Sequence, residues 1–421
     1  MKLKRLHLFM CSVIFATSMT AASQELVSPN FPKRYDITAG SIQDAATDNS
    51  GNAYVIYESG GSIYLKKNRD CRELISAGTK AAIAMDSAGN INVIYTNNGL
   101  KYKKRTGPLW GPEREVSACG KALGTEFYSI DTDSSGNAHI AADYGGSLGH
   151  IIYTKDNGDS WSGPIAELTG SAAMKCQSPV IRIDCDNKYH LAYVAEIAGS
   201  NHINIDSNSS NGNISSGGYG SAYLTSNAMS LNGAVAYIAY AADGEIHIAQ
   251  ADSKWAVLES FTGATATISY CDLLGKGVAY ASSGVKYRAD TGAGFSAAAD
   301  IDAAGVNPIA VLDSENSRNP YVYFEKPSTS RILLATDKII VSTDATVTSK
   351  TYEVSTLGGI SRAIVIPAGQ TIKKTAFLGA LSKGDLAQTW NTSDILDPIV
   401  SGNKLVVTAE NGSRLTYTLR E

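Results

Sequence analysis

The sequence predicts an all-β protein, a seven-bladed β-propeller followed by a small β-sandwich. Two observations support this prediction: a unit of about 44 residues recurs between residues 35 and 343, and the last 75 or so residues do not continue it. No stretch of useful length places apolar residues at the i, i+3, i+4 and i+7 spacing of an amphipathic helix. The composition is 43% hydrophobic and only 18% charged, which is enough apolar material to bury a sizeable core.

Each repeat contains an Asp-rich turn that leads into an alternating strand rich in Tyr, Val and Ile. The anchoring residues are Asp48, Asp86, Asp133, Asp184, the degenerate Ser230, Asp272 and Asp313. Their six intervals average about 44 residues, the length of a four-stranded propeller blade. A lone four-stranded sheet cannot bury both of its faces, whereas sheets stacked around a ring can. Because the fourth and fifth units have drifted most, a six-bladed ring with one irregular repeat is the alternative.

Residues 1–23 have the pattern of an export signal. A basic start at 1–5 precedes an apolar run at 6–19, and small residues at 20–23 offer a cleavage site before Gln24. No later stretch approaches the 18 apolar residues of a membrane span, and Cys11 lacks the context of a lipoprotein signal. We therefore expect a secreted, periplasmic or cell-surface protein, with the propeller over 24–344 and the sandwich over 345–421.

Charge and cysteine content limit the partners and cofactors. The formal net charge of −4 gives no basic footprint for nucleic acid, and a monomer is expected. Five cysteines follow the signal without a CxxC pair; a Cys119–Cys176 bridge is possible, but free thiols are preferred. The run from Asp131 to Gly136 matches the opening of a calcium loop, yet Ala142 stands where such a loop needs its bidentate Glu. No cofactor or metal is predicted.

Two segments resemble known modules of secreted proteins. The run 154–161 resembles the Asp-box, S/T-x-D-x-G-x-S/T-W, of sialidases and related propellers with BNR repeats. Its signature residues are Thr154, Asp156, Gly158, Ser160 and Trp161. In that family the box stabilises a hairpin on the face opposite the active site, so the resemblance implies a structural role. The hairpin over 405–419 resembles the end of bacterial Ig-like β-sandwich modules, which implies a spacer or attachment domain.

The face opposite the Asp-box is where we expect a ligand. It is formed by the loops between second and third strands and by the loops between blades, and propeller ligands sit at the channel mouth there. Arginine is sparse, and only Arg182 lies squarely in an innermost strand, so the three-arginine carboxylate clamp of sialidases is not expected. The candidate ligand-binding residues are Glu58, Glu126, Asp143, Tyr144, Arg182, Glu196, Asn201, His202, Asp243 and Glu325.

Two classes of function follow from these features. The first is a non-catalytic propeller that binds an extracellular glycan or another surface ligand such as a protein. The second is a glycan-active enzyme of the sialidase-like superfamily, a glycoside hydrolase or polysaccharide lyase, with its site at the channel mouth. The thin supply of Arg and His favours binding, and no catalytic residue is assigned.

Overall fold

A computed structural model describes most of the chain after the predicted export signal. The described residues are 31, 33–118, 121–144, 149–164, 166–168, 174–207, 212–213, 218–225, 228–232, 235–250, 256–262, 268–271, 277–289, 294–312, 320–336, 340, 345–354, 362–385 and 387–421. Cys119 and the anchors Asp272 and Asp313 lie outside them.

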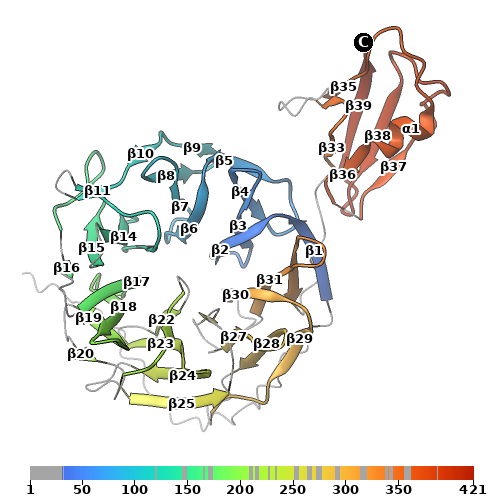
Figure 1. The fold of residues 1–421 in the computed structure, drawn as a ribbon. Coiled ribbons are helices and arrows are strands. Elements are labelled where there is room, and N and C mark those ends of the chain that lie inside the picture. The colour runs from blue at the N-terminus through green and yellow to red at the C-terminus, as the bar shows by residue number, and fades with distance from the viewer. Residues whose placement is uncertain are drawn as a thin grey trace, which may run out of the picture.

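Antiparallel sheets follow one another around a ring (Figure 1), and we number them as blades, each written from its inner strand outward. Blade 1 is β2 (Ser41–Thr47), β3 (Ala53–Ser59), β4 (Ser62–Lys67) and β5 (Glu73–Ala77). Blade 2 is β6 (Thr79–Met85), β7 (Ile91–Thr96), β8 (Leu100–Thr106) and β10 (Arg114–Glu115), with β9 (Leu109–Trp110) also on β8. Blade 3 is β13 (Tyr128–Thr132), β14 (Ala138–Tyr144), β15 (His150–Lys155) and β16 (Ala166–Leu168). A hairpin of β11 (Ser117–Ala118) and β12 (Lys121–Ala122) precedes it.

The second half of the ring repeats the pattern. Blade 4 is β17 (Met174–Ile183), β18 (Tyr189–Ile197), β19 (Ser200–Ser207) and β20 (Gly212–Asn213). In blade 5, β21 (Ala222–Tyr223) and β22 (Met229–Asn232) both pair with β23 (Val235–Ala242), and β24 (Glu245–Gln250) and β25 (Ala256–Thr262) follow. Blade 6 is β26 (Ile268–Cys271), β27 (Gly277–Ala281), β28 (Val285–Ala289) and β29 (Ala299–Asp302). Blade 7 is β30 (Val306–Leu312), β31 (Pro320–Lys326), β32 (Arg331–Thr336) and β1 (Lys33–Ala39).

The predicted fold class, an all-β propeller, is confirmed, and the described strands of the ring form seven sheets of four or five strands beside the two-stranded β11–β12 hairpin. The N-terminal strand β1 pairs antiparallel with β32, so the first strand of the ring completes its last sheet. The repeat pattern gives no sign of this pairing, because it joins residues almost 300 positions apart. It ties the two ends of the ring together.

The core of the ring lies in the seams between blades. One hydrophobic cluster joins Ile94 and Tyr102 of blade 2 to Ile130 and Ile140 of blade 3. Many of the sequence's 22 tyrosines serve this packing, since several, including Tyr57, are less than 2% exposed. An amphipathic ring side chain fills a seam while its hydroxyl reaches toward polar neighbours.

The Asp anchors act as turn staples. Asp86 Oδ1 accepts hydrogen bonds from the backbone N–H groups two and four residues later, at 3.0 and 2.8 Å, and Asp48, Asp133 and Asp184 repeat this geometry. Carboxylates favour such turns because they satisfy amides that a tight bend leaves unpaired.

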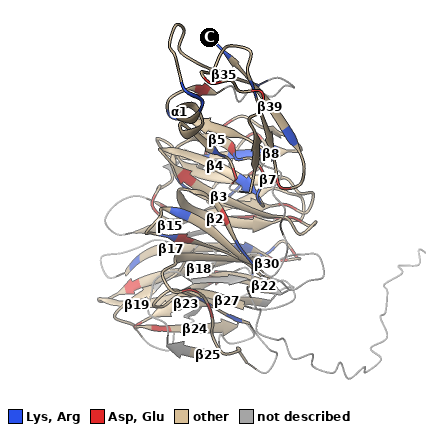
Figure 2. Ribbon diagram, turned by 90° about the vertical axis from the view of Figure 1, so that its right-hand side faces the viewer, with Lys and Arg blue, Asp and Glu red and all other residues tan. Residues whose placement is uncertain are grey.

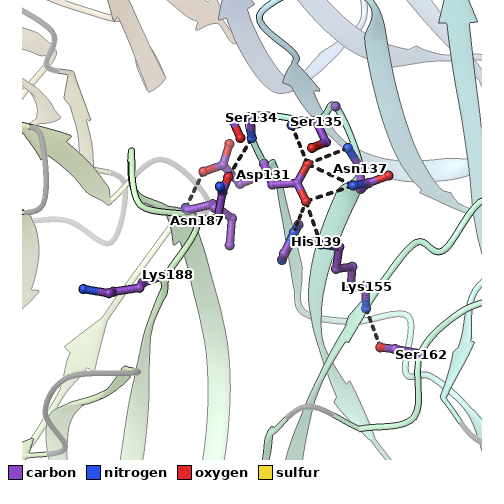
Figure 3. A network of polar contacts seen from close by, with 12 residues as sticks. Asp131, Ser134, Ser135, Asn137, His139, Lys155, Ser162, Asn187 and Lys188 are labelled. Atoms are coloured by element: carbon purple, nitrogen blue, oxygen red, sulfur yellow. Dashed lines mark hydrogen bonds and ion pairs between the residues drawn. The ribbon is translucent and has the colours of Figure 1, made fainter. Parts of the chain in front are cut away.

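Figure 3 shows the anchor network of blade 3. Asn137 donates to the Asp133 carboxylate, Lys155 Nζ lies 2.7 Å from it, and His139 Nε2 lies 3.3 Å from it. Burial opposes ionisation, but these partners outweigh it and hold the pKa of Asp133 well below its usual range. A neighbouring contact joins blades, since the Ser134 N–H donates to Asn187 Oδ1. This face is therefore occupied by structural contacts.

The Asp-box segment forms a turn on the same side as the anchors. Asp156 accepts from the Gly158 N–H at 2.9 Å and receives both terminal nitrogens of Arg114 at 2.9 and 3.1 Å. The Trp161 indole packs edge-on against Tyr102 of blade 2 and donates to the Glu115 carbonyl. Thr154 donates to the Ser162 carbonyl, and Asn157 N–H donates to the Ser160 carbonyl. The segment thus joins blade 3 to blade 2.

The C-terminal residues form a separate unit at the edge of the ring (Figure 1). Its five-stranded sheet runs β34 (Glu353–Val354), β35 (Arg362–Val365), β39 (Arg414–Arg420), β38 (Lys404–Thr408) and β37 (Thr389–Asn391). A second pair is β33 (Val347–Ser349) and β36 (Leu381–Lys383), next to α1 (Lys374–Gly379). The unit has its own apolar core, which includes Phe377 and Tyr417. The predicted hairpin at 405–419 is present, and the all-β prediction fails at one place in this unit, where residues 374–379 form α1.

One arginine of the propeller joins the two units. Arg69, in the loop between β4 and β5, lies with Nη2 2.9 Å from Asp385 Oδ1 and Nη1 2.6 Å from Glu410 Oε2. Its Nη1 also donates to the Ile340 carbonyl, and its guanidinium lies over the Tyr35 ring. The side chains of Arg69 and Asp385 are only 7% and 1% exposed. We call this group of contacts the Arg69 clasp.

The cysteine thiols and the charged side chains bear on the disulfide and the partners considered from the sequence. Cys176 is buried with a free thiol, so the alternative of a Cys119–Cys176 bridge is wrong, and Cys71 and Cys185 are exposed. In the side view of Figure 2, basic and acidic residues are interspersed along the ring. No helix among the described residues is long and apolar enough to cross a membrane.

Candidate functional site

A cavity of about 290 Å³ opens at the mouth of the central channel. Its lining comes from the first strands of blades 1 to 4, from the two residues just before β13, and from the segment between β21 and β22 of blade 5. The lining residues are Gln43, Lys80, Ala81, Ala82, Glu126, Phe127, Tyr128, Ser178, Pro179, Leu224 and Thr225. These residues stand near the starts of the inner strands, whereas the Asp anchors follow the ends of those strands. The cavity therefore lies on the face where we expect a ligand.

β-Bulges shape the wall of this cavity. The pairing of β6 with β7 skips Lys80, that of β17 with β18 skips Ser178 and Pro179, and that of β2 with β3 skips Gln43. Lys80 and Ser178 adopt the left-handed backbone region, with φ of 43° and 54°. Such a conformation is uncommon for residues with a side chain, and bulges of this kind re-aim side chains next to functional sites.

A glycine makes the bulge in β6 possible. Gly78 has φ of 148°, and a Cβ there would lie 2.6 Å from the carbonyl oxygen of Thr96. Only glycine fits such a close approach of two backbones. The chain therefore enters β6 close against β7 and then bulges outward at Lys80.

Phe127, Lys80 and Glu126 form the chemically distinctive part of the cavity. The Phe127 ring is 36% exposed, which is high for a large apolar side chain. Lys80 Nζ donates to the Glu126 carbonyl at 3.2 Å and lies 5.9 Å from the centre of the Phe127 ring. An aromatic face, a cation and a carboxylate thus stand together beside the hydroxyls of Ser178 and Thr225 and the amide of Gln43.

Asp143 holds the segment that carries Glu126 and Phe127. Its Oδ1 accepts the Phe127 N–H at 3.1 Å, and its carbonyl accepts the Gly124 N–H. A Cβ at position 124 would lie 2.4 Å from the Asp143 carboxylate, so glycine leaves the room that this carboxylate occupies. Burial raises the pKa of Asp143, and the nearby charge of Glu126 adds to the shift.

The other predicted site residues have backbone or ion-pair partners of their own. Glu325 accepts from Ser41 Oγ and the Ile42 N–H, Glu58 accepts from the Gly61 N–H, and Asp243 accepts from the Gly220 and Ser221 N–H groups. Glu196 pairs with Lys175, Asn201 forms a backbone bridge with Tyr219, and Tyr144 packs on His150. His202 lies in β19 within 3.1 Å of where a Cβ on Gly218 would stand. Of the ten predicted residues, Glu126 alone lines the described cavity.

Arg182 lies at the wrong end of its strand for a channel-mouth ligand. It stands four residues beyond Ser178 in β17, which at about 3.3 Å per residue places its backbone roughly 13 Å deeper. It donates to the Ile181 carbonyl and interacts electrostatically with Asp131.

Four of the cavity residues that sequence reasoning missed share one position in the repeat. Lys80, Phe127, Ser178 and Leu224 each stand six residues before an anchor, namely Asp86, Asp133, Asp184 and Ser230. Aligning the repeats on their anchors and reading this column would have found them. The described residues hold no group of three or more His, Cys, Asp or Glu side chains placed to bind a metal ion.

No protein-family model matches the chain, and no curated protein matches it. Similar solved structures include a fucose-specific lectin of Aleuria aurantia, at 13% identity over 70% of this chain and 91% of that one, with a TM-score of 0.39. A streptogramin B lyase is 11% identical over 72% and 96% of the two chains, with a TM-score of 0.45. A polysaccharide lyase bound to a sulfated disaccharide repeat is 10% identical over 72% and 97%, with a TM-score of 0.46. Similarity at this level concerns the fold and carries no argument about activity.

Proposed function

We propose that this protein is an exported carbohydrate-binding propeller that holds a sugar, without turning it over, in the cavity at its channel mouth. The observation that carries the proposal is the exposed Phe127 ring beside bulged strands that aim Lys80 and Ser178 into the same cavity. Sugars present apolar C–H faces that pack on aromatic rings, and hydroxyls that need donors and acceptors around them.

The size and charge of the cavity fit a short, uncharged sugar segment. A volume of about 290 Å³ is at the lower end of the range for ligand pockets, which favours a terminal residue or two over a long chain. Lys80 and Glu126 bring one charge of each sign, so neither an anionic nor a cationic ligand is selected by net charge alone. Both groups form strong hydrogen bonds with hydroxyls.

Residues 1–23 direct export in this proposal, and the C-terminal unit acts as an attachment or spacer module that the Arg69 clasp holds beside the ring. N-terminal sequencing of the protein recovered outside the cytoplasm tests the first statement, with Gln24 as the expected first residue. Recovery of the protein with Met1 intact would contradict it.

The binding test compares variants on a glycan array and then by calorimetry on the best ligand. Phe127→Ala is expected to weaken binding at least about tenfold, equivalent to about 1.4 kcal/mol. Leu109→Ala is the matched control, because Leu109 is 73% exposed on β9 and lines no part of the cavity. Lys80→Ala is expected to weaken binding as well. Lys175→Ala is its control, because Lys175 is a lysine that does not line the cavity. Binding by Phe127→Ala as tight as by the unaltered chain would refute the proposal.

A glycan-active enzyme at the same cavity is the second candidate. One observation favours it: Asp143, with a raised pKa, stands beside the exposed Glu126. Glycosidases commonly use two carboxyl groups in different environments for acid–base cleavage of a glycosidic bond. Product analysis on every glycan bound by the array separates the candidates, since turnover lost in Glu126→Gln supports the enzyme and binding without products supports the first proposal.

A further inference from the structure

The seam between blades 4 and 5 holds a second group of polar and aromatic side chains, none of which lines the channel-mouth cavity. The His247 imidazole stacks on the Tyr240 ring with 4.9 Å between centroids, and the Tyr219 ring lies 5.6 Å from it. The hydroxyls of Tyr219 and Tyr240 are 3.3 Å apart. These contacts hold the imidazole in one plane.

His247 faces a serine on the neighbouring strand. In the pairing of β24 with β25, His247 stands opposite Ser260, and Nδ1 of the imidazole lies 2.7 Å from the serine Oγ. His247 is 8% exposed, whereas Ser260 is exposed to solvent. A hydroxyl that reaches solvent is therefore hydrogen-bonded to a base that does not.

Glu245 lies on the other side of that base. Its Oε2 is 3.8 Å from His247 Nε2. A carboxylate near Nε2 favours a proton on that nitrogen, which leaves the Nδ1 lone pair for the Ser260 hydroxyl. Burial lowers the pKa of His247 despite the nearby carboxylates, so the ring is neutral near pH 7 and free to take a proton.

From this geometry we propose that Ser260 is a nucleophile for acyl transfer from carboxylic esters, with His247 as its general base and Glu245 as the residue that orients the base. A nucleophile within hydrogen-bond reach of a base, with a third group orienting that base, is the arrangement that activates serine. A nucleophile, base and orienting residue of this kind are recognised by their mutual geometry, whatever the fold and whatever their order in the sequence.

The reaction balances with water as the only co-reactant. Ser260 Oγ attacks the ester carbonyl carbon while its proton moves to His247 Nδ1, and the tetrahedral adduct then expels the alcohol, which takes that proton. Water attacks the acyl-serine in the same way and releases the carboxylic acid. β25 is the last strand of its sheet in the described part of the chain, and an edge strand turns alternate N–H groups outward, where the proposal requires one of them to donate to the oxyanion.

A fluorophosphonate probe followed by peptide mass spectrometry tests the assignment. The probe is expected to label Ser260, and His247→Gln is expected to slow labelling at least about a hundredfold, the lower end of what a general base contributes. Glu245→Gln should slow it less. Ser283→Ala is the matched control, since Ser283 is another exposed hydroxyl, which donates to the Ser282 carbonyl, and its loss should leave Ser260 labelling unchanged.

Hydrolysis of p-nitrophenyl acetate supplies a readout that does not depend on His247→Gln folding. Loss of the hydrolysis in Ser260→Ala, with reduced hydrolysis in Glu245→Gln, supports the proposal, whereas hydrolysis unchanged in Ser260→Ala overturns it. Absence of the probe from Ser260, or equal labelling in a folded His247→Gln, also overturns it. Phe127→Ala should not alter either readout, so failure of the glycan-binding proposal leaves this result intact.

Discussion

Asp385→Asn is expected to loosen the C-terminal unit from the propeller, because it removes one charge of the Arg69 clasp and leaves the other buried. The two side chains are 1% and 7% exposed and their charged atoms lie 2.9 Å apart. The asparagine keeps the shape and can still accept the Ala387 N–H that Asp385 accepts now. Asp385→Asn therefore removes the negative charge while it keeps the shape of the side chain.

The expected magnitude follows from this burial. Removing one partner of a buried ion pair costs about 3–5 kcal/mol when the remaining charge stays buried and unpaired. Arg69 keeps Glu410 and gains access to water when the unit moves, so we expect a loss toward the lower end of that range. The second carboxylate of the clasp offers a control on the same arginine: Glu410 is 41% exposed, and an exposed pair contributes about 0–1 kcal/mol. Glu410→Gln should therefore have a small effect where Asp385→Asn has a large one.

Calorimetric unfolding and small-angle scattering measure the two consequences. Asp385→Asn should lower the transition of the C-terminal unit and increase the radius of gyration as the unit swings away and lets Arg69 reach water. Arg69→Met combined with Asp385→Asn should recover part of the loss, since no buried charge remains and the Glu410 carboxylate is already partly exposed. The reasoning is refuted if Glu410→Gln and Asp385→Asn have equal effects, or if Asp385→Asn changes stability by less than about 1 kcal/mol.

Three further predictions concern the ring. Asp156→Ala should lower the free energy of unfolding by about 1–3 kcal/mol, because the Gly158 N–H and Arg114 lose their acceptor, and it should leave glycan affinity per folded molecule unchanged in the same calorimetric titration. The free energy of unfolding should fall as the pH drops below 6.5, the ordinary pKa of histidine. Burial lowers the pKa of His139 in the folded chain, so the unfolded chain takes up the proton first. The free energies from denaturant titrations at about pH 7 and about pH 5.5 should therefore differ less for His139→Gln than for the unaltered chain. Deleting residues 346–421 should leave a propeller that still unfolds cooperatively, since β1 closes the ring without them; an insoluble chain or a broad, non-cooperative melt would count against this.

Sequence reasoning succeeded where local physics decides the outcome. The Asp anchors satisfy their own turns within four residues, so their spacing reveals the blades directly. It failed where distant residues decide. The pairing of β1 with β32 depends on closure of the whole ring, and α1 forms in a segment whose composition also suits a strand.

The candidate site was predicted only as a face. Acidic residues in loops drew attention, yet Glu58, Asp243 and Glu325 use their carboxylates on backbone amides. The cavity instead depends on bulges, and a bulge shows itself only in how one strand pairs with the next. Lys80 and Ser178 look like ordinary strand residues until their left-handed backbone is seen.

A crystal structure of the chain with the best glycan from the array would test the central claim most directly. We expect a sugar ring packed on Phe127 in the channel-mouth cavity, with hydroxyls within hydrogen-bond distance of Lys80 and Glu126. A sugar bound instead on the face of the Asp anchors, or on the C-terminal unit with the cavity empty, would contradict it.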